Sequence, residues 1–194
     1  MEQTDIVGAA VGAALFSRRA FESVEALPDL AAAALWIPFF AGVSELVGQA
    51  YVLAARRIGG ARAVASFALT GLVHVIAVGV WASACYLFLE LDHIKTDTLA
   101  TLLGVIALGY APRLLGVFTI APFFGEVLGR VLDAWAMACV AWGIWIVTRE
   151  PPAPVLLCAG LGWVASLSVR RFGGFLLSPL LRIAGLSIAG MRRV

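Results

Sequence analysis

The chain has little charge: only 13% of its 194 residues are Asp, Glu, Lys or Arg, whereas 62% are hydrophobic. An ordinary globular domain is about one-quarter charged and about half apolar. A soluble fold of this length could not bury so much apolar surface, so the composition predicts a polytopic membrane protein. The net charge of +2 is too small to indicate a nucleic-acid partner.

Motifs typical of catalytic or metal-binding sites are also absent from the sequence. Cys85, Cys139 and Cys158 are isolated in apolar stretches, which is typical of small buried side chains and not of a disulfide framework or a metal site. The sequence contains no HExxH, no GxSxG and no glycine-rich phosphate loop with a lysine. We therefore expect no enzyme activity, no metal and no cofactor.

Long apolar stretches dominate what remains. A helix needs about 20 apolar residues to cross the hydrocarbon core of a bilayer. Five stretches are predicted to do so: 30–55, 63–89, 98–121, 124–147 and 154–169. The predicted fold is an all-α membrane bundle of about five transmembrane helices, divided into an N-terminal interfacial segment (1–28), the five-helix domain (29–171) and a basic amphipathic C-terminal helix (172–194).

Basic residues gather after the last predicted span. We expect the side chains there to face the headgroups of anionic lipids, a partner typical of basic amphipathic helices. Counting loop cations places the C-terminus in the cytoplasm. The residues expected to face lipid headgroups are Arg170, Arg171, Arg182, Arg192 and Arg193.

Two prolines affect the third span: Pro112 lies within it, and Pro122 directly follows it. Pro112 has no N–H, so the carbonyl of Leu108 loses its helical partner, and Pro122 does the same to the carbonyl of Phe118. A carbonyl inside a bilayer must be satisfied by protein. The third helix is therefore predicted to be kinked or broken at Pro112. Broken helices line substrate sites in transporters, but they are also ordinary packing features.

Polar residues inside the predicted spans form the candidate site. Glu126, Arg130 and Asp133 follow one another at helical spacing, so they share a face of the fourth span. Arg113 could neutralise the leftover negative charge, and Glu45 needs His74 or Arg113 as a partner. The predicted intramembrane network comprises Glu45, Gln49, His74, Tyr110, Arg113, Glu126, Arg130 and Asp133.

Two interpretations of this network stay open. Paired charges can simply hold helices in register, and ionisable groups inside a membrane can also form a proton or ion path. Small residues four apart add possible helix contacts, within the chain or with another chain. These pairs are Ser44 with Gly48, Gly79 with Ser83, and Gly125 with Gly129.

One region resembles a known family. The run LGYAPRLLGVFTIAPFFGEVLGRVLDAWAMACVAWGIW is similar to the core of bacterial Yip1-domain membrane proteins in Gly109, Tyr110, Pro112, Trp135 and Gly143. The runs SELVGQAYVLAARR and AGLGWV resemble cyanobacterial members, so the likeness covers roughly residues 30 to 170. It implies a five-helix domain without catalysis and a cytosolic N-terminus, opposite to the loop-cation count. The short N-terminal segment lacks a DLYGP-like motif, so binding to small GTPases is not expected.

These observations predict a non-enzymatic scaffold, assembly or membrane-organising protein in a bacterial inner membrane or a thylakoid-type membrane. Its expected partners are anionic lipids and other membrane proteins, with a homo-oligomer possible. The alternative is a small transporter or proton-coupled channel that uses the intramembrane network.

Overall fold

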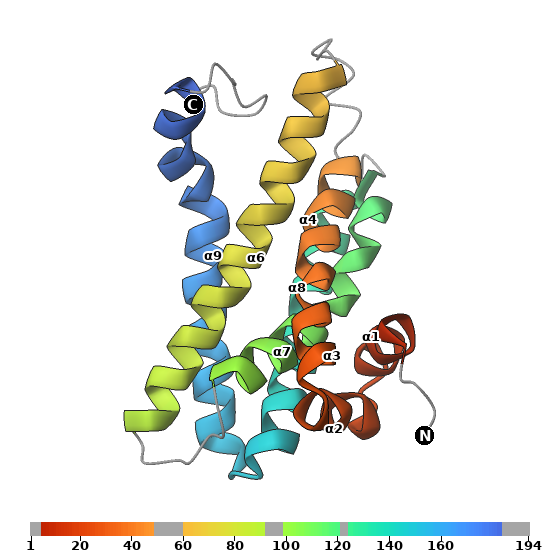
Figure 1. Ribbon diagram of the computed structural model, residues 1–194, viewed down its shortest axis with the longest axis vertical. Helices are drawn as coiled ribbons and strands as arrows, with labels where there is room; N and C mark the ends of the chain where they lie inside the picture. The colour runs from red at the N-terminus through yellow and green to blue at the C-terminus, as the bar shows by residue number, and fades with distance from the viewer. Residues whose placement is uncertain (1–4, 49–59, 92–98, 121–123, 184–194) are drawn as a thin grey trace.

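The computed structural model describes residues 5–48, 60–91, 99–120 and 124–183, and every regular element in these ranges is a helix (Figure 1). The elements are α1 (Ile6–Ala14), α2 (Arg18–Ala26), α3 (Pro28–Ala34), α4 (Trp36–Gly48), α6 (Gly60–Leu91), α7 (Leu99–Gly109), the 3₁₀ helix η1 (Ala111–Ile120), α8 (Gly125–Thr148) and α9 (Pro152–Ile183).

Five helical stretches are long and apolar enough to cross a membrane, which confirms the predicted all-α polytopic bundle. Together they make the chain a multi-pass membrane protein. In the view of Figure 1, α6 and α9 run side by side, α4 packs against η1 and α6, and α8 packs against η1. The stretches are Pro28–Gly48, Val64–Leu91, Leu99–Ile120, Gly125–Thr148 and Pro152–Phe172.

The N-terminal segment folds into two short helices against the bundle. Within the predicted interfacial segment, α2 is amphipathic: Arg18 pairs with Glu22 on the outer face, while Phe21 and Val24 are buried. The apolar face therefore packs on protein, against α7 and α8, instead of entering lipid. Helix α1 was not predicted, because its run of Ala, Gly and Val has no polar face that would signal a helix.

The connection between α1 and α2 uses an unusual residue. The N–H of Ser17 donates to the carbonyl of Gly12 at 2.8 Å, and the N–H of Phe16 donates to the carbonyl of Ala13 at 3.1 Å. This pattern is a Schellman motif, whose left-handed position is usually glycine. Here Phe16 occupies that position with a φ of 59°. A bulky aromatic residue rarely adopts this conformation.

Prolines mark two breaks along the spans. Pro38 cannot donate to the carbonyl of Ala34, and α3 ends at Ala34. Helix α7 ends at Gly109, and the chain continues as η1, which confirms the predicted break at Pro112. A 3₁₀ helix of 10 residues is unusually long, since such runs seldom exceed about four residues.

Helices α6 and α9 pack closely through small residues. A methyl group at Gly162 would overlap the indole of Trp81, so α9 approaches α6 there without a side chain between them. The thiol of Cys85 donates to the carbonyl of Cys158 at 3.2 Å. All three cysteines are free and buried, as predicted.

The fifth span does not end where the sequence analysis predicted. Arg170 and Arg171 were expected to stop the fifth span, with a separate helix from residue 172. Instead α9 continues without a break to Ile183, because nothing in the backbone near these arginines interrupts the helix. Arg192 and Arg193 lie outside the described residues. Arg182 lies within α9, but the description does not extend to its side chain.

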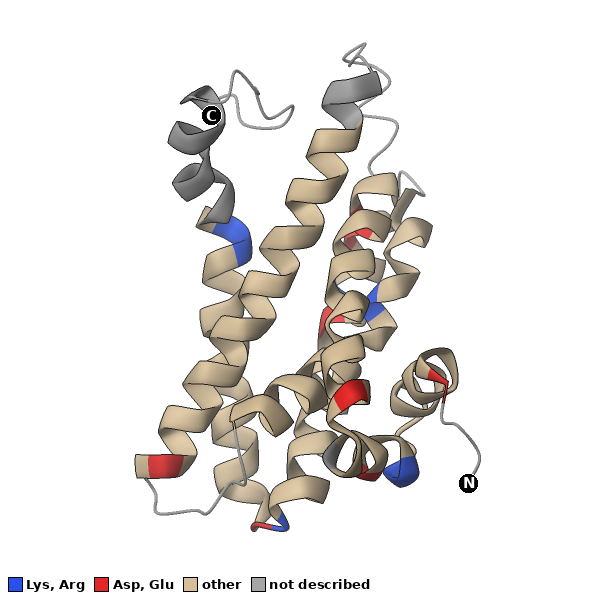
Figure 2. Cartoon of the chain, viewed as in Figure 1, with Lys and Arg blue, Asp and Glu red and all other residues tan. Residues whose placement is uncertain are grey.

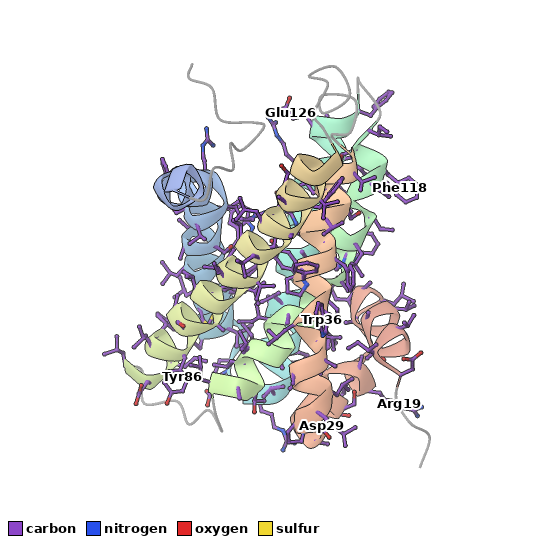
Figure 3. All side chains as sticks on the ribbon, turned by 45° about the horizontal axis from the view of Figure 1, so that its top comes forward. Arg19, Asp29, Trp36, Tyr86, Phe118 and Glu126 are labelled. Carbon is purple, nitrogen blue, oxygen red and sulfur yellow. The ribbon has the colours of Figure 1, made fainter. Side chains whose placement is uncertain are left out.

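Charged residues lie mainly at the two ends of the bundle, with a smaller group between them (Figure 2). Figure 3 shows Glu126 and Phe118 toward one end, and Arg19 and Asp29 toward the other. The charges between the ends form the candidate site.

Candidate functional site

The centre of the site is the carboxylate of Glu45 on α4. Its Oε2 accepts a hydrogen bond of 2.5 Å from Nη2 of Arg113, and it lies 3.2 Å from Nε2 of His74. Arg113 and His74 are almost entirely buried, whereas the Glu45 side chain is 33% exposed. The carboxylate therefore connects η1 and α6 to α4 and faces the edge of the network.

Arg113 also reaches the other side of the network. Its Nη1 forms an ion pair with the Asp133 carboxylate on α8, and Nη2 of Arg170 on α9 donates to the same carboxylate at 3.0 Å. Each carboxylate thus has more than one cationic or imidazole neighbour. The two guanidiniums balance the two carboxylates, so the four permanent charges sum to zero. Such pairing is what makes buried charges tolerable in an apolar medium.

The network lies well inside the bundle. Asp133 follows Glu126 by seven residues, which is about 10 Å along a helix at 1.5 Å per residue. Glu126 lies in the first turn of α8, at one end of the bundle (Figure 3). The polar site is therefore about two helical turns below that end.

His74 faces two hydrogen-bond acceptors. Its Nδ1 lies 2.9 Å from the carbonyl oxygen of Thr70, and its Nε2 lies 3.2 Å from the carboxylate of Glu45. A backbone carbonyl only accepts, so Nδ1 must carry a proton. The ring therefore connects the backbone of α6 to the carboxylate on α4.

The ring of Tyr110 packs against two members of the network, Arg113 and His74. The guanidinium carbon of Arg113 lies 5.4 Å from the centre of its ring, within the range of a cation–π contact. The His74 ring approaches it edge to face, with the ring centres 6.1 Å apart. Tyr110 is 1% exposed, and its hydroxyl has no hydrogen-bond partner among the described residues.

Ser44 satisfies the backbone of η1 beside the charges. Its hydroxyl donates to the carbonyl of Leu114 at 2.6 Å and accepts from the N–H of Val117 at 2.8 Å. These two backbone groups are three residues apart, the spacing at which a 3₁₀ helix would pair them directly. One side chain from α4 therefore completes the hydrogen bonds of the broken helix.

Small residues allow this close approach. A methyl group at Gly116 would lie 3.1 Å from the backbone nitrogen and Cα of Glu45. A methyl group at Gly48 would lie 2.6 Å from the carbonyl oxygen of Gly116. The predicted pair Ser44 and Gly48 therefore serves a contact within the chain, between α4 and η1.

Several predicted site residues lie elsewhere. Glu126 and Arg130 pair with each other at 2.5 Å, but their side chains are 80% and 77% exposed. They face outward because Asp133, three residues further along α8, pairs with arginines of other elements instead of with Arg130. Arg171 is exposed near the same end of the bundle. Gln49 and Pro122 lie outside the described residues.

Two participants were not assigned to the network from the sequence. Arg170 was expected to face lipid headgroups, but its side chain is 12% exposed and binds Asp133. Ser44 was considered only as a small residue. Nothing in its sequence context indicates that it would bond a backbone 70 positions away.

Comparison with family models, curated proteins and solved structures finds no match for this chain. The resemblance to Yip1-domain proteins therefore stays a prediction that rests on the sequence motifs alone.

Proposed function

We propose that the protein acts by binding, as a non-enzymatic scaffold, assembly or membrane-organising factor. The observation that carries this proposal is the closure of the polar network. Glu45 and Asp133 are paired with Arg113 and Arg170, and Ser44 bonds the backbone of η1. These groups link α4, α6, η1, α8 and α9 to one another, as expected of a rigid framework whose outer faces make the contacts.

The outer face of α6 offers a surface for such contacts. A methyl group at Gly79 would meet no described atom within 4 Å, and Ser83 is exposed one turn further along. Small residues at this spacing let two helices approach closely in a bilayer. Leu72, Ile76 and Leu87 are exposed on the same stripe. The partner would be another membrane protein or a second copy of this chain.

The proposed setting is a bacterial inner membrane or a thylakoid-type membrane. The resemblance of its sequence motifs to those of bacterial and cyanobacterial Yip1-domain proteins supports this setting. Anionic lipids are proposed as further partners at the end that carries Arg171.

The test is purification from the native membrane in mild detergent, followed by mass spectrometry of whatever copurifies in fixed ratio. Gly79→Leu should reduce the recovered partner or shift a homo-oligomer to monomer, because a bulky side chain would separate the helices. Gly160→Leu is the matched control, since Gly160 on α9 also has open space around it. A solitary monomer from the wild-type membrane would contradict the proposal.

A proton-coupled carrier is the second candidate, and one observation favours it. The imidazole of His74 lies within hydrogen-bond distance of the Glu45 carboxylate, and Glu45 is one-third exposed at the edge of the network. Ionisable groups inside membranes often belong to proton relays. In proteoliposomes with a pH-sensitive dye, a carrier would lose flux on Glu45→Gln but not on Glu126→Gln, which alters an exposed ion pair. Absence of flux in the wild type would exclude this candidate.

A further inference from the structure

An apolar groove lies at the end of the bundle opposite the ion network, where α8 runs into α9. Its volume is about 410 Å³. Trp142 and Trp145 form the α8 wall, Val155 and Leu156 form the α9 wall, and Phe16 covers one side from the turn between α1 and α2. The two walls belong to helices that are long and apolar enough to cross a membrane.

Two residues of opposite charge lie in the connection between α8 and α9. Helix α8 is capped by Arg149, whose N–H donates to the carbonyl of Trp145 at 2.9 Å, and Glu150 follows it directly. Arg149 is exposed, and neither residue has an ion-pair partner within the described parts of the chain. This connection joins Trp145 to Pro152, and both of these residues line the groove.

The backbone beside the groove is held in a rare conformation at two places. Phe16 and Arg149 are the residues other than glycine with positive φ in the described chain, at 59° and 56°. Phe16 lines the groove, and Arg149 follows the lining residue Trp145 by four positions. Such conformations tend to cluster at ligand-binding sites, where the surrounding structure maintains them.

We propose that this groove binds one zwitterionic phospholipid whose headgroup carries a phosphate and a primary ammonium. One acyl chain lies between the tryptophans of α8 and the aliphatic side chains of α9. The phosphate lies on Arg149 and the ammonium lies near Glu150. Trp145 is 42% exposed, four residues before Arg149, at the depth where indoles favour the interface between headgroups and chains.

The assignment to a zwitterionic lipid follows from the charges. An anionic lipid with a neutral glycerol headgroup would satisfy Arg149 but would place its negative charge beside Glu150 without a compensating cation. The ethanolamine headgroup supplies one charge of each sign, a phosphate for Arg149 and an ammonium for Glu150. The site does not depend on the scaffold proposal, because Asp133 precedes Trp145 by 12 residues, or about 18 Å of helix.

The test uses full-length protein in nanodiscs that contain equal amounts of phosphatidylethanolamine and phosphatidylglycerol with identical acyl chains. Native mass spectrometry then counts the lipids that each chain retains after the nanodisc is removed. We expect one phosphatidylethanolamine per chain in the wild type. Ala138→Phe fills the groove from an exposed position, and it should lower retention about tenfold, the effect of displacing about two methylene groups.

Ala134→Phe is the matched control, because Ala134 is also exposed on α8, one turn away, and does not line the groove. Arg149→Gln should also reduce retention, whereas Arg171→Gln at the opposite end should not. Arg149 is a surface residue, so this comparison holds even if Ala138→Phe fails to fold. Equal retention of the two lipids, or equal loss in Ala138→Phe and Ala134→Phe, would overturn the proposal and indicate only nonspecific surrounding lipid.

Discussion

Glu45 and Arg113 are 68 positions apart in the chain, yet the carboxylate accepts a hydrogen bond of 2.5 Å from the guanidinium. The contact joins the first span to the broken third span. It places a charged pair about as deep in the bundle as His74, whose ring is 5% exposed. Most of the consequences that can be tested follow from this contact and its neighbours.

Replacing Arg113 should destabilise the protein strongly. Arg113→Met would leave Glu45 and Asp133 without a shared cation, and removing one partner from a buried ion pair costs roughly 3–5 kcal/mol. Denaturant unfolding in detergent micelles would measure the loss. Arg130→Gln is the control, because its pair with Glu126 is mostly exposed and should contribute less than about 0.5 kcal/mol. Equal effects of the two changes would mean that the network does not stabilise the fold.

Ser44→Ala should weaken the contact between α4 and η1. The substitution leaves the carbonyl of Leu114 and the N–H of Val117 without their partner, and an unsatisfied buried polar group costs about 1–3 kcal/mol. Ser83→Ala is a matched control, because the Ser83 hydroxyl bonds only the carbonyl of Gly79 in its own helix. Hydrogen exchange of the η1 amides should increase in the first variant alone. Unchanged exchange would contradict the role given to Ser44.

Gly48→Ala should be destabilising although alanine favours helices. Its methyl group would lie 2.6 Å from the carbonyl oxygen of Gly116 and would also overlap Thr119, so α4 and η1 would have to separate. Overpacking of this kind costs about 1–3 kcal/mol. Gly129→Ala, at a position with open space, should instead stabilise by about 0.5–1 kcal/mol. Thermal unfolding of both variants gives the comparison, and shifts of the same sign would refute it.

Arg149→Gly should raise stability in detergent without added lipid. Arg149 has a φ of 56°, a conformation that costs a side-chain residue about 1 kcal/mol and costs glycine little. Arg171→Gly is the control, since glycine inside α9 should lower stability by about 1 kcal/mol. If Arg149→Gly also destabilises the lipid-free protein, the side chain has a structural role that the described contacts do not include.

The helical architecture could be predicted from the sequence because membrane insertion depends on properties of short stretches of chain, such as apolar length. Apolar length identified the five spans, and the missing N–H of Pro112 identified the break between α7 and η1. Each of these follows from composition or from hydrogen-bonding capacity within a few residues along the chain.

The pairing of the charges could be predicted only in part. Glu45 was expected to need His74 or Arg113, and the structure places both beside it. The same reasoning grouped Glu126 and Arg130 with Asp133, because helical spacing puts all three on one side of α8. Spacing does not specify how far each residue lies from the end of the bundle or which neighbouring helix it meets.

The sequence by itself determined that this is a bundle of apolar helices with a few ionisable side chains that cannot face lipid without a large desolvation penalty. Only the tertiary structure decided which charge neutralises which. Arg170 binds Asp133 because α9 crosses α8 at that level, and Ser44 bonds the backbone of η1 because Gly48 and Gly116 let the two elements touch. Such contacts depend on helix crossing and depth, and these are set by packing among residues far apart in the chain.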